Sequence, residues 1–226
     1  MRRPARYSNL EESLNISTHA LGFLLGIVAF YHLLELASSQ KDSLKYFSSV
    51  VFGCSLVLLY ASSTIYHCTR KVIWRLRMQV ADHSAIFIMI AGSATPFSLV
   101  TLNENSGWTM FFLLWSVAIV GIVLKIFFTG RFKILSTLMY LAMGWVFMLT
   151  VGPLIENLGW PGFFWLLGGG LSYSIGALFY SLERVKLNHA IFHVFVLVGS
   201  YCHYHAIYQY VICLLYTSDA ADESTC

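Results

Sequence analysis

The sequence predicts an all-α fold, a bundle of seven transmembrane helices with no soluble domain. Of its 226 residues, 58% are hydrophobic and only 11% are charged, and the mean hydropathy is +0.68. Soluble globular chains carry roughly 25% charged residues, so this chain has too few to cover a surface that faces water. Seven apolar windows of spanning length follow one another, and because backbone polar groups must be satisfied within hydrocarbon, each is expected to be helical.

The windows are delimited by length, because a spanning helix needs about 20 mainly apolar residues. Charged or turn-forming residues separate them, and the separators are short. In order, the predicted spans cover residues 18–37, 46–67, 81–102, 108–128, 134–155, 159–181 and 189–210. The chain therefore divides into an N-terminal segment (1–17), a seven-helix membrane domain (18–212) and a tail (213–226).

The basic residues predict the orientation, because Lys and Arg are retained in cytoplasmic loops. Only Lys41 and Lys45 fall on one side of the predicted bundle. The other side collects Arg2, Arg3, Arg6, Arg70, Lys71, Arg75, Arg77, Lys125, Arg131, Lys133, Arg184 and Lys186. We therefore expect segment 1–17 to be cytoplasmic and, after an odd number of spans, the C-terminus to lie outside.

Composition also indicates which kinds of partner the protein can have. The 14 basic residues of the whole chain are too few for a nucleic-acid-binding module, so membrane lipid is the expected partner, and no feature identifies a protein partner. The tail 213–226 is acidic and aperiodic, unlike the rest of the chain. It is either a disordered external terminus or non-native sequence, and no function is assigned to it.

Ionisable groups within the bilayer are a functional lead, because each costs about 2.5–3.5 kcal/mol to insert. The second predicted span ends at His67, whereas the third and seventh begin near Asp82 and His189. Given the direction of each span, all three lie at the cytoplasmic end. His193 lies one turn from His189, and Ser63 one turn from His67, each on the same helix face as its partner.

Three histidines from two helices at one depth suit Zn²⁺. Neutral imidazoles bind this cation well, and three protein ligands plus water are typical of catalytic zinc. His189 and His193, four residues apart, would form a two-point clamp completed by His67. The alternative is a set of histidines that hydrogen-bond between helices, as polar residues in membrane bundles often do.

A further polar stripe precedes the first span. Glu11, Asn15 and His19 recur at fourfold spacing. They either cap and pack this helix or form a second layer of polar contacts near the metal. Gly168, Gly169, Gly170 and Gly176 in the sixth span indicate either close helix packing or a flexible gate, and small residues commonly permit such packing.

Four motifs together resemble those of the hemolysin III family of bacterial membrane proteins, within the wider progestin and adipoQ receptor family that includes the adiponectin receptors. They cover residues 11–19 (EESLNISTH), 63–67 (STIYH), 82–86 (DHSAI) and 189–193 (HAIFH), and the resemblance extends over residues 11–212. It implies seven helices, a cytoplasmic N-terminus and zinc bound by His67, His189 and His193, with Asp82 joined to the ion through water. The receptors' soluble N-terminal extension is missing here, so hormone binding is not carried over.

The expected function is hydrolysis of a lipid amide or ester with zinc-bound water, similar to the ceramidase activity of the receptor branch. Asp82 would act as general acid/base, and Ser63 would donate a hydrogen bond to the developing oxyanion. The lipid would enter laterally, and the bacterial inner (cytoplasmic) membrane is the expected location of this multi-pass protein. Two alternatives remain: a non-enzymatic sensor or modulator with a structural zinc, and a pore-forming cytolysin, which the integral seven-helix topology disfavours.

Overall fold

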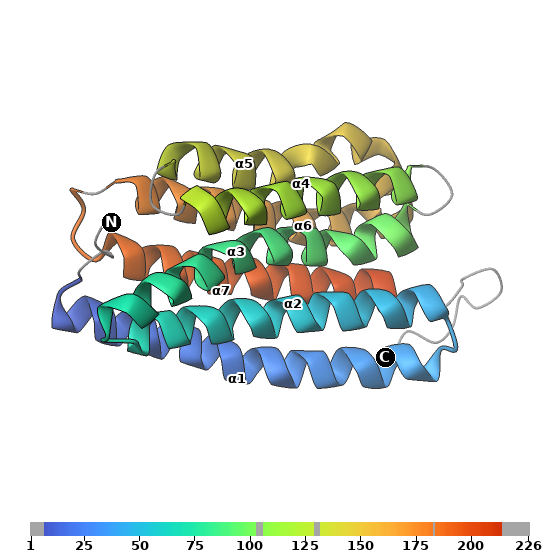
Figure 1. Cartoon of the computed structure of the whole chain (residues 1–226). Helices are drawn as coiled ribbons and strands as arrows, with labels where there is room; N and C mark the ends of the chain where they lie inside the picture. The colour runs from blue at the N-terminus through green and yellow to red at the C-terminus, as the bar shows by residue number, and fades with distance from the viewer. Residues whose placement is uncertain (1–6, 103–105, 129–131, 183, 214–226) are drawn as a thin grey trace.

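The computed structural model describes residues 7–102, 106–128, 132–182 and 184–213, and every regular element in these ranges is a helix. Figure 1 shows an elongated bundle whose long helices run side by side. The elements are α1 Asn9–Ser39, α2 Ser43–Cys68, α3 Val72–Pro96, η1 Phe97–Thr101, α4 Gly107–Phe128, α5 Lys133–Trp145, η2 Val146–Thr150, α6 Val151–Ser181, α7 Asn188–Ile207 and η3 Tyr208–Ile212. The predicted all-α class is confirmed for this part of the chain.

Six helical stretches of the described residues are long and apolar enough to cross a membrane, where the sequence predicted seven. The predicted spans 134–155 and 159–181 fall together in the stretch Ile134–Ser181, which has 48 residues. Within it the backbone leaves helical geometry at Gly159, with φ 66° and ψ 167°. This conformation is open to glycine because it has no Cβ, so the interruption falls where the sixth predicted span begins.

The outer surface of the bundle is apolar. Leu149 is 82% exposed, Ile134 76% and Phe127 73%, and large exposed hydrophobic side chains recur on all the long helices. A water-soluble monomer rarely exposes such extended apolar surface. The exposed apolar residues and the six long stretches together make this a membrane protein with several spans.

Polar caps determine where two of the helices begin. The hydroxyl of Ser8 accepts a hydrogen bond from the Glu11 amide at 3.2 Å, so α1 begins at Asn9 rather than near residue 18. Asp42 caps α2 in the same way, through the amide of Leu44 at 2.8 Å. Because capped polar residues extend α1 beyond its apolar window, the helix includes the whole EESLNISTH motif.

Helix direction brings the polar motifs together. In Figure 1 the start of α1, the end of α2 and the starts of α3 and α7 all lie at the left end of the bundle. Glycine allows close contact between these helices: a Cβ on Gly22 of α1 would lie 2.6 Å from the ring of Tyr60 in α2. The end of the bundle where these four helices meet therefore carries the candidate site.

Four glycines of α6 were predicted either to allow close helix packing or to form a flexible gate. A Cβ on Gly169 would overlap the His203 ring of α7, and one on Gly176 would lie 2.9 Å from Phe195, so both serve close packing. Gly168 and Gly170 face open space instead, because no heavy atom of the described residues lies within 4 Å of the position that a Cβ would take. Close packing thus accounts for two of the four glycines.

Candidate metal centre

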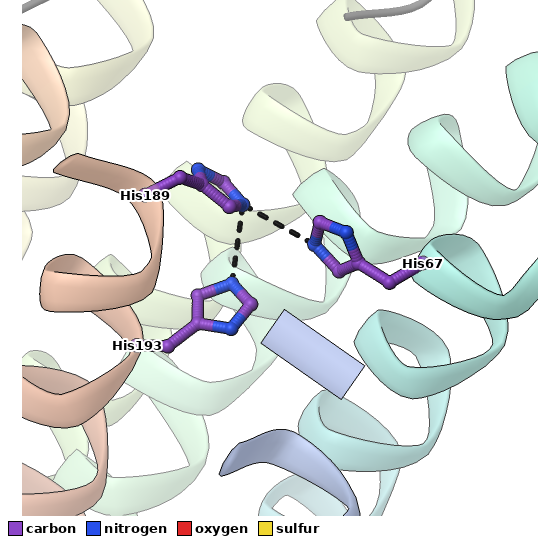
Figure 2. Close-up of side chains that lie close together, drawn as sticks. All are labelled: His67, His189 and His193. Atoms are coloured by element: carbon purple, nitrogen blue, oxygen red, sulfur yellow. Dashed lines mark hydrogen bonds between the residues drawn. The ribbon is translucent and has the colours of Figure 1, made fainter. Parts of the chain in front are cut away.

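Three histidine side chains converge between α2 and α7, as Figure 2 shows. Nε2 of His189 lies 3.2 Å from Nε2 of His67 and 3.1 Å from Nε2 of His193. One ligand atom from each ring lies within 4.8 Å of the others, and all three side chains are buried. The convergence predicted from span direction is therefore present.

The contacts on the outer sides of the rings indicate their tautomers. Nδ1 of His67 lies 2.8 Å from Oε2 of Glu12, and Nδ1 of His193 lies 3.4 Å from Oγ1 of Thr18. The Thr18 hydroxyl donates its own proton to the carbonyl of Leu14 at 2.7 Å. Both Nδ1 atoms are therefore assigned as donors, which leaves the lone pairs of both Nε2 atoms facing inward.

This assignment distinguishes a metal site from hydrogen bonding between the rings. If Nε2 of His67 and His193 are both acceptors, His189 Nε2 can offer a proton to only one of them. At least one close Nε2 pair then lacks a proton, which is unfavourable in a buried site unless a cation lies between the atoms. Two nitrogens bound to tetrahedral zinc at 2.0–2.1 Å are about 3.3–3.4 Å apart, close to the 3.1 and 3.2 Å found here. The three histidines could hold a metal ion, and two of their nitrogen pairs have nearly the spacing of zinc ligands.

Asp82 and Ser63 lie in the same region without joining the histidine group. Both side chains are buried and line the cavity that His189 and His193 also line. The Ser63 hydroxyl lies near the Asp82 carboxylate, but no hydrogen bond of acceptable geometry joins it to any described residue. Asp82 is thus near the centre but outside the three-histidine group, an arrangement compatible with contact through water.

The stripe on α1 adjoins the centre. His19 stacks on His193 with ring centroids 3.5 Å apart, and Asn15 is fully buried. Both ring nitrogens of His19 and both amide atoms of Asn15 are buried without a hydrogen-bond partner among the described residues, as is Oε1 of Glu11. Because α1 begins at Asn9, these residues lie within the helix and do not cap it. They therefore pack inside the bundle beside His193, and their role as a second layer of polar contacts around a metal stays a prediction.

Glu12 and Tyr7, like Thr18, lie outside the predicted set and contact the histidines. Glu12 bonds to His67 and pairs with Arg75 of α3, with 2.5 Å between Oε1 and Nη2. Tyr7 stacks on His189, with ring centroids 4.7 Å apart, and burial raises the pKa of its hydroxyl well above the usual range. The signal for Glu12 was available, because Glu12, Asn15 and His19 follow the i, i+3, i+7 spacing of one helix face.

A large cavity of about 1040 Å³ connects the centre to the interior of the bundle. Its lining passes from Tyr7, Asp82 and His193 to apolar side chains such as Phe97 and Leu166. Its volume is at the upper end of the range for ligand sites, about 300–1,000 Å³. The lining is mainly apolar; besides the polar groups of the centre it includes Ser93, Tyr173 and His203.

Comparison with known sequences agrees with the site. The family described as Haemolysin-III related matches residues 7–204, which include His67, His189 and His193. The chain belongs to this haemolysin III family. It is 42% identical to Hemolysin-3 of Bacillus cereus over 202 residues, which are 89% of this chain and 92% of that protein. It is 41% identical to a Hemolysin-3 homolog of Bacillus subtilis (strain 168), covering 89% and 95% of the two chains.

A more distant relative is the human Monocyte to macrophage differentiation factor. It is 27% identical over 211 residues, which are 89% of this chain and 84% of that protein. The predicted resemblance to the hemolysin III family is confirmed, and the bacterial relatives indicate a bacterial membrane.

Proposed function

We propose that this haemolysin III family member is a zinc-dependent hydrolase that cleaves an amide or ester bond of a membrane lipid. The observation that carries the proposal is the position of three converging histidines beside a large, mainly apolar cavity that Asp82 and Ser63 also line. A cavity with convergent polar groups and mainly apolar walls suits a substrate with one reactive polar bond and a long chain.

Three ligands favour catalysis over a purely structural ion. Structural zinc sites are normally closed by four protein ligands, whereas catalytic sites keep a position open for water or substrate. Among the described residues, the His, Cys, Asp and Glu side chains at ligand distance are His67, His189 and His193. When bound there, zinc would lower the pKa of a water molecule and polarise the carbonyl under attack.

The chain's own groups have distinct roles in this proposal. Asp82 accepts the proton of the attacking water and returns it to the leaving amine or alcohol, as general acid/base. The Ser63 hydroxyl, buried without a hydrogen-bond partner in the described structure, donates to the oxygen on which negative charge develops. Glu12 and Thr18 hold His67 and His193 with their Nε2 atoms turned inward.

The topology belongs to the same proposal. Seven crossings result if the chain reverses at the Gly159 interruption, and the excess of basic residues then orients the metal centre toward the cytoplasm. In a bacterium the membrane would be the inner one. The lipid would enter laterally between α5 and α6, where Gly144 and Gly170 line the cavity and face open space.

The Asp82→Asn variant tests the function. Purified protein in nanodiscs of bacterial lipid is supplied with lipid esters and amides, released fatty acid is quantified by mass spectrometry, and zinc is measured on the same samples. We expect turnover to fall about 10²–10⁴-fold while bound zinc stays near the wild-type level. Asp42→Asn serves as the control, because Asp42 caps α2 by its side chain and does not line the cavity.

Unchanged turnover in Asp82→Asn would contradict the proposed mechanism. No turnover in wild-type protein that retains zinc would instead favour a non-enzymatic sensor or modulator with a structural ion. Leakage of dye from liposomes that contain the purified protein would support a pore.

A further inference from the structure

The cavity is deep enough to hold a whole acyl chain. Along α3, its lining runs from Asp82 through Ile86 and Ile90 to Phe97. At 1.5 Å per residue, the positions from 82 to 97 span about 22 Å. One leaflet contributes about half of a hydrocarbon core of about 30 Å, so this depth exceeds the length of one leaflet's acyl layer. With the reactive bond at the metal centre, the chain therefore extends toward Phe97.

Three cations line the same cavity as the metal centre. Lys125 of α4 and two residues of the α6–α7 loop, Arg184 and Lys186, contribute to this lining. The carboxylates that the described residues contribute to the lining are Glu11 and Asp82, which lie on the α1 and α3 side. Among the residues that the structure describes, the charged side chains at the mouth of the cavity on the α4 and loop side are therefore cations.

Lys125 is turned inward although its position would let it avoid burial. It lies in the last turn of α4, from which a lysine can normally extend its ammonium into water. Instead it is 7% exposed and lines the cavity, while its neighbours Ile126 and Phe127 are 56% and 73% exposed. Lys125 therefore places a cation in the cavity wall and not in the solvent around the end of α4.

The position of Lys125 is coupled to the helix that carries Asp82. Its Nζ lies 5.8 Å from the ring centroid of Tyr140. The Tyr140 hydroxyl in turn donates a hydrogen bond to the carbonyl of His83 at 2.9 Å, next to Asp82. Tyr140 therefore links Lys125 to the backbone of α3 beside Asp82.

The loop that carries the other two cations is held in place. Asn188 donates from Nδ2 to the carbonyl of Phe179 at 3.3 Å, and the amide of Val185 donates to the carbonyl of Leu182 at 3.0 Å. Arg184 and Lys186 themselves are exposed, at the rim of the cavity. The cationic lining thus combines one buried group with two at the rim.

We propose that Lys125, with Arg184 and Lys186, binds the phosphate of a lipid head group, so that the substrates are anionic phospholipids. The inference rests on the proposed function, because it names the lipid class on which that hydrolase would act. In a free fatty acid the only anionic group is the carboxyl at the chain end, which would lie at the metal centre and leave the cationic mouth unused. A glycerophospholipid places a phosphate a few bonds beyond the acyl ester, on the leaving-group side, and both Lys and Arg recognise phosphate.

A binding measurement tests this inference without requiring turnover. The whole protein, with Asp82→Asn to prevent hydrolysis, is titrated in detergent with dioleoyl phosphatidylglycerol, dioleoylglycerol, oleate or inorganic phosphate, and bound ligand is followed by native mass spectrometry. We expect phosphatidylglycerol to bind about tenfold or more tightly than dioleoylglycerol, and Lys125→Gln to remove this difference. Lys71→Gln is the matched control, because Lys71 is exposed and does not line the cavity.

A second variant keeps the test decisive if Lys125→Gln does not fold. The double change Arg184→Gln and Lys186→Gln alters only exposed side chains, and it should weaken phosphatidylglycerol binding while leaving dioleoylglycerol binding unchanged. Equal binding of the two lipids by the wild-type background would overturn the inference. The inference would also be overturned if Lys125→Gln weakened the binding of oleate alone. The same holds if inorganic phosphate bound as tightly as phosphatidylglycerol.

The two proposals fail separately. Head-group preference without turnover in the wild-type protein would support the phosphate site and overturn the hydrolase. Turnover without head-group preference would overturn the phosphate site alone.

Discussion

Glu12 of α1 accepts a hydrogen bond from Nδ1 of His67 in α2, with 2.8 Å between the two atoms. The same carboxylate pairs with Arg75 of α3. One side chain therefore links three helices and fixes the ring of a proposed zinc ligand. Carboxylates that hold a ligating histidine in this way raise its basicity and define its tautomer.

The Glu12→Ala variant should lower zinc affinity about 10–100-fold, because His67 loses the acceptor that holds its Nε2 inward. Glu12→Gln retains an acceptor oxygen and should have a smaller effect. Affinity is measured by competition with a zinc chelator on purified protein. Glu35→Gln is the control, since the Glu35 side chain is 65% exposed near the far end of α1. Equal affinities for all three variants would show that the contact with His67 is unimportant for metal binding.

Zinc itself is tested by the double variant His189→Ala and His193→Ala. Removal of two of three ligands should reduce bound zinc from about one equivalent to near zero, as measured by elemental analysis of purified protein. The control is the pair His32→Ala and His205→Ala, whose rings lie outside the three-histidine group. Zinc retained in the first double variant would mean that the ion is bound elsewhere in the protein.

Ser63→Ala should lower turnover about 10²–10³-fold if the hydroxyl donates to the oxyanion, with bound zinc unchanged. Ser62→Ala provides the matched comparison, because the neighbouring Ser62 is also buried but donates to the carbonyl of Leu59 at 3.0 Å. Fatty-acid release is measured for both. A loss of similar size in the two variants would indicate general destabilisation and not a catalytic hydroxyl.

Gly168 and Gly169 of α6 are adjacent, so substitutions at the two positions give a matched test of helix packing. Gly169→Ala should destabilise the protein by about 1–3 kcal/mol, because the new methyl group overlaps the His203 ring and forces α6 and α7 apart. Gly168→Ala should change stability by less than about 0.5 kcal/mol, since that position faces open space. Thermal unfolding in detergent compares the two. Equal melting temperatures would argue against tight contact at Gly169.

The residues of the three-histidine group could be predicted from the sequence, because the lengths of the apolar spans and the distribution of Lys and Arg indicate the direction of each helix. The end of one span at His67 and the starts of others near Asp82 and His189 placed these residues at one depth, and the structure brings the three histidines together. Glu12 escaped selection because the polar stripe was followed at fourfold spacing through Glu11, Asn15 and His19, although the same helix face also includes Glu12. The helix itself begins at Asn9, where Ser8 caps it, and not near residue 18. An apolar window measures the hydrocarbon thickness and not the length of the helix.

The sequence by itself determined the membrane-embedded helical class, the family and the histidines that converge, since composition, apolar length and motif spacing are local properties of the chain. Only the tertiary structure decided which groups face one another across helices: Glu12 against His67, His19 stacked on His193, and Lys125 turned into the cavity. The reason is that the rotation of each helix about its axis depends on packing against its neighbours, through small residues such as Gly22 and Gly169. That rotation also determines the shape of the cavity, which no apolar window describes.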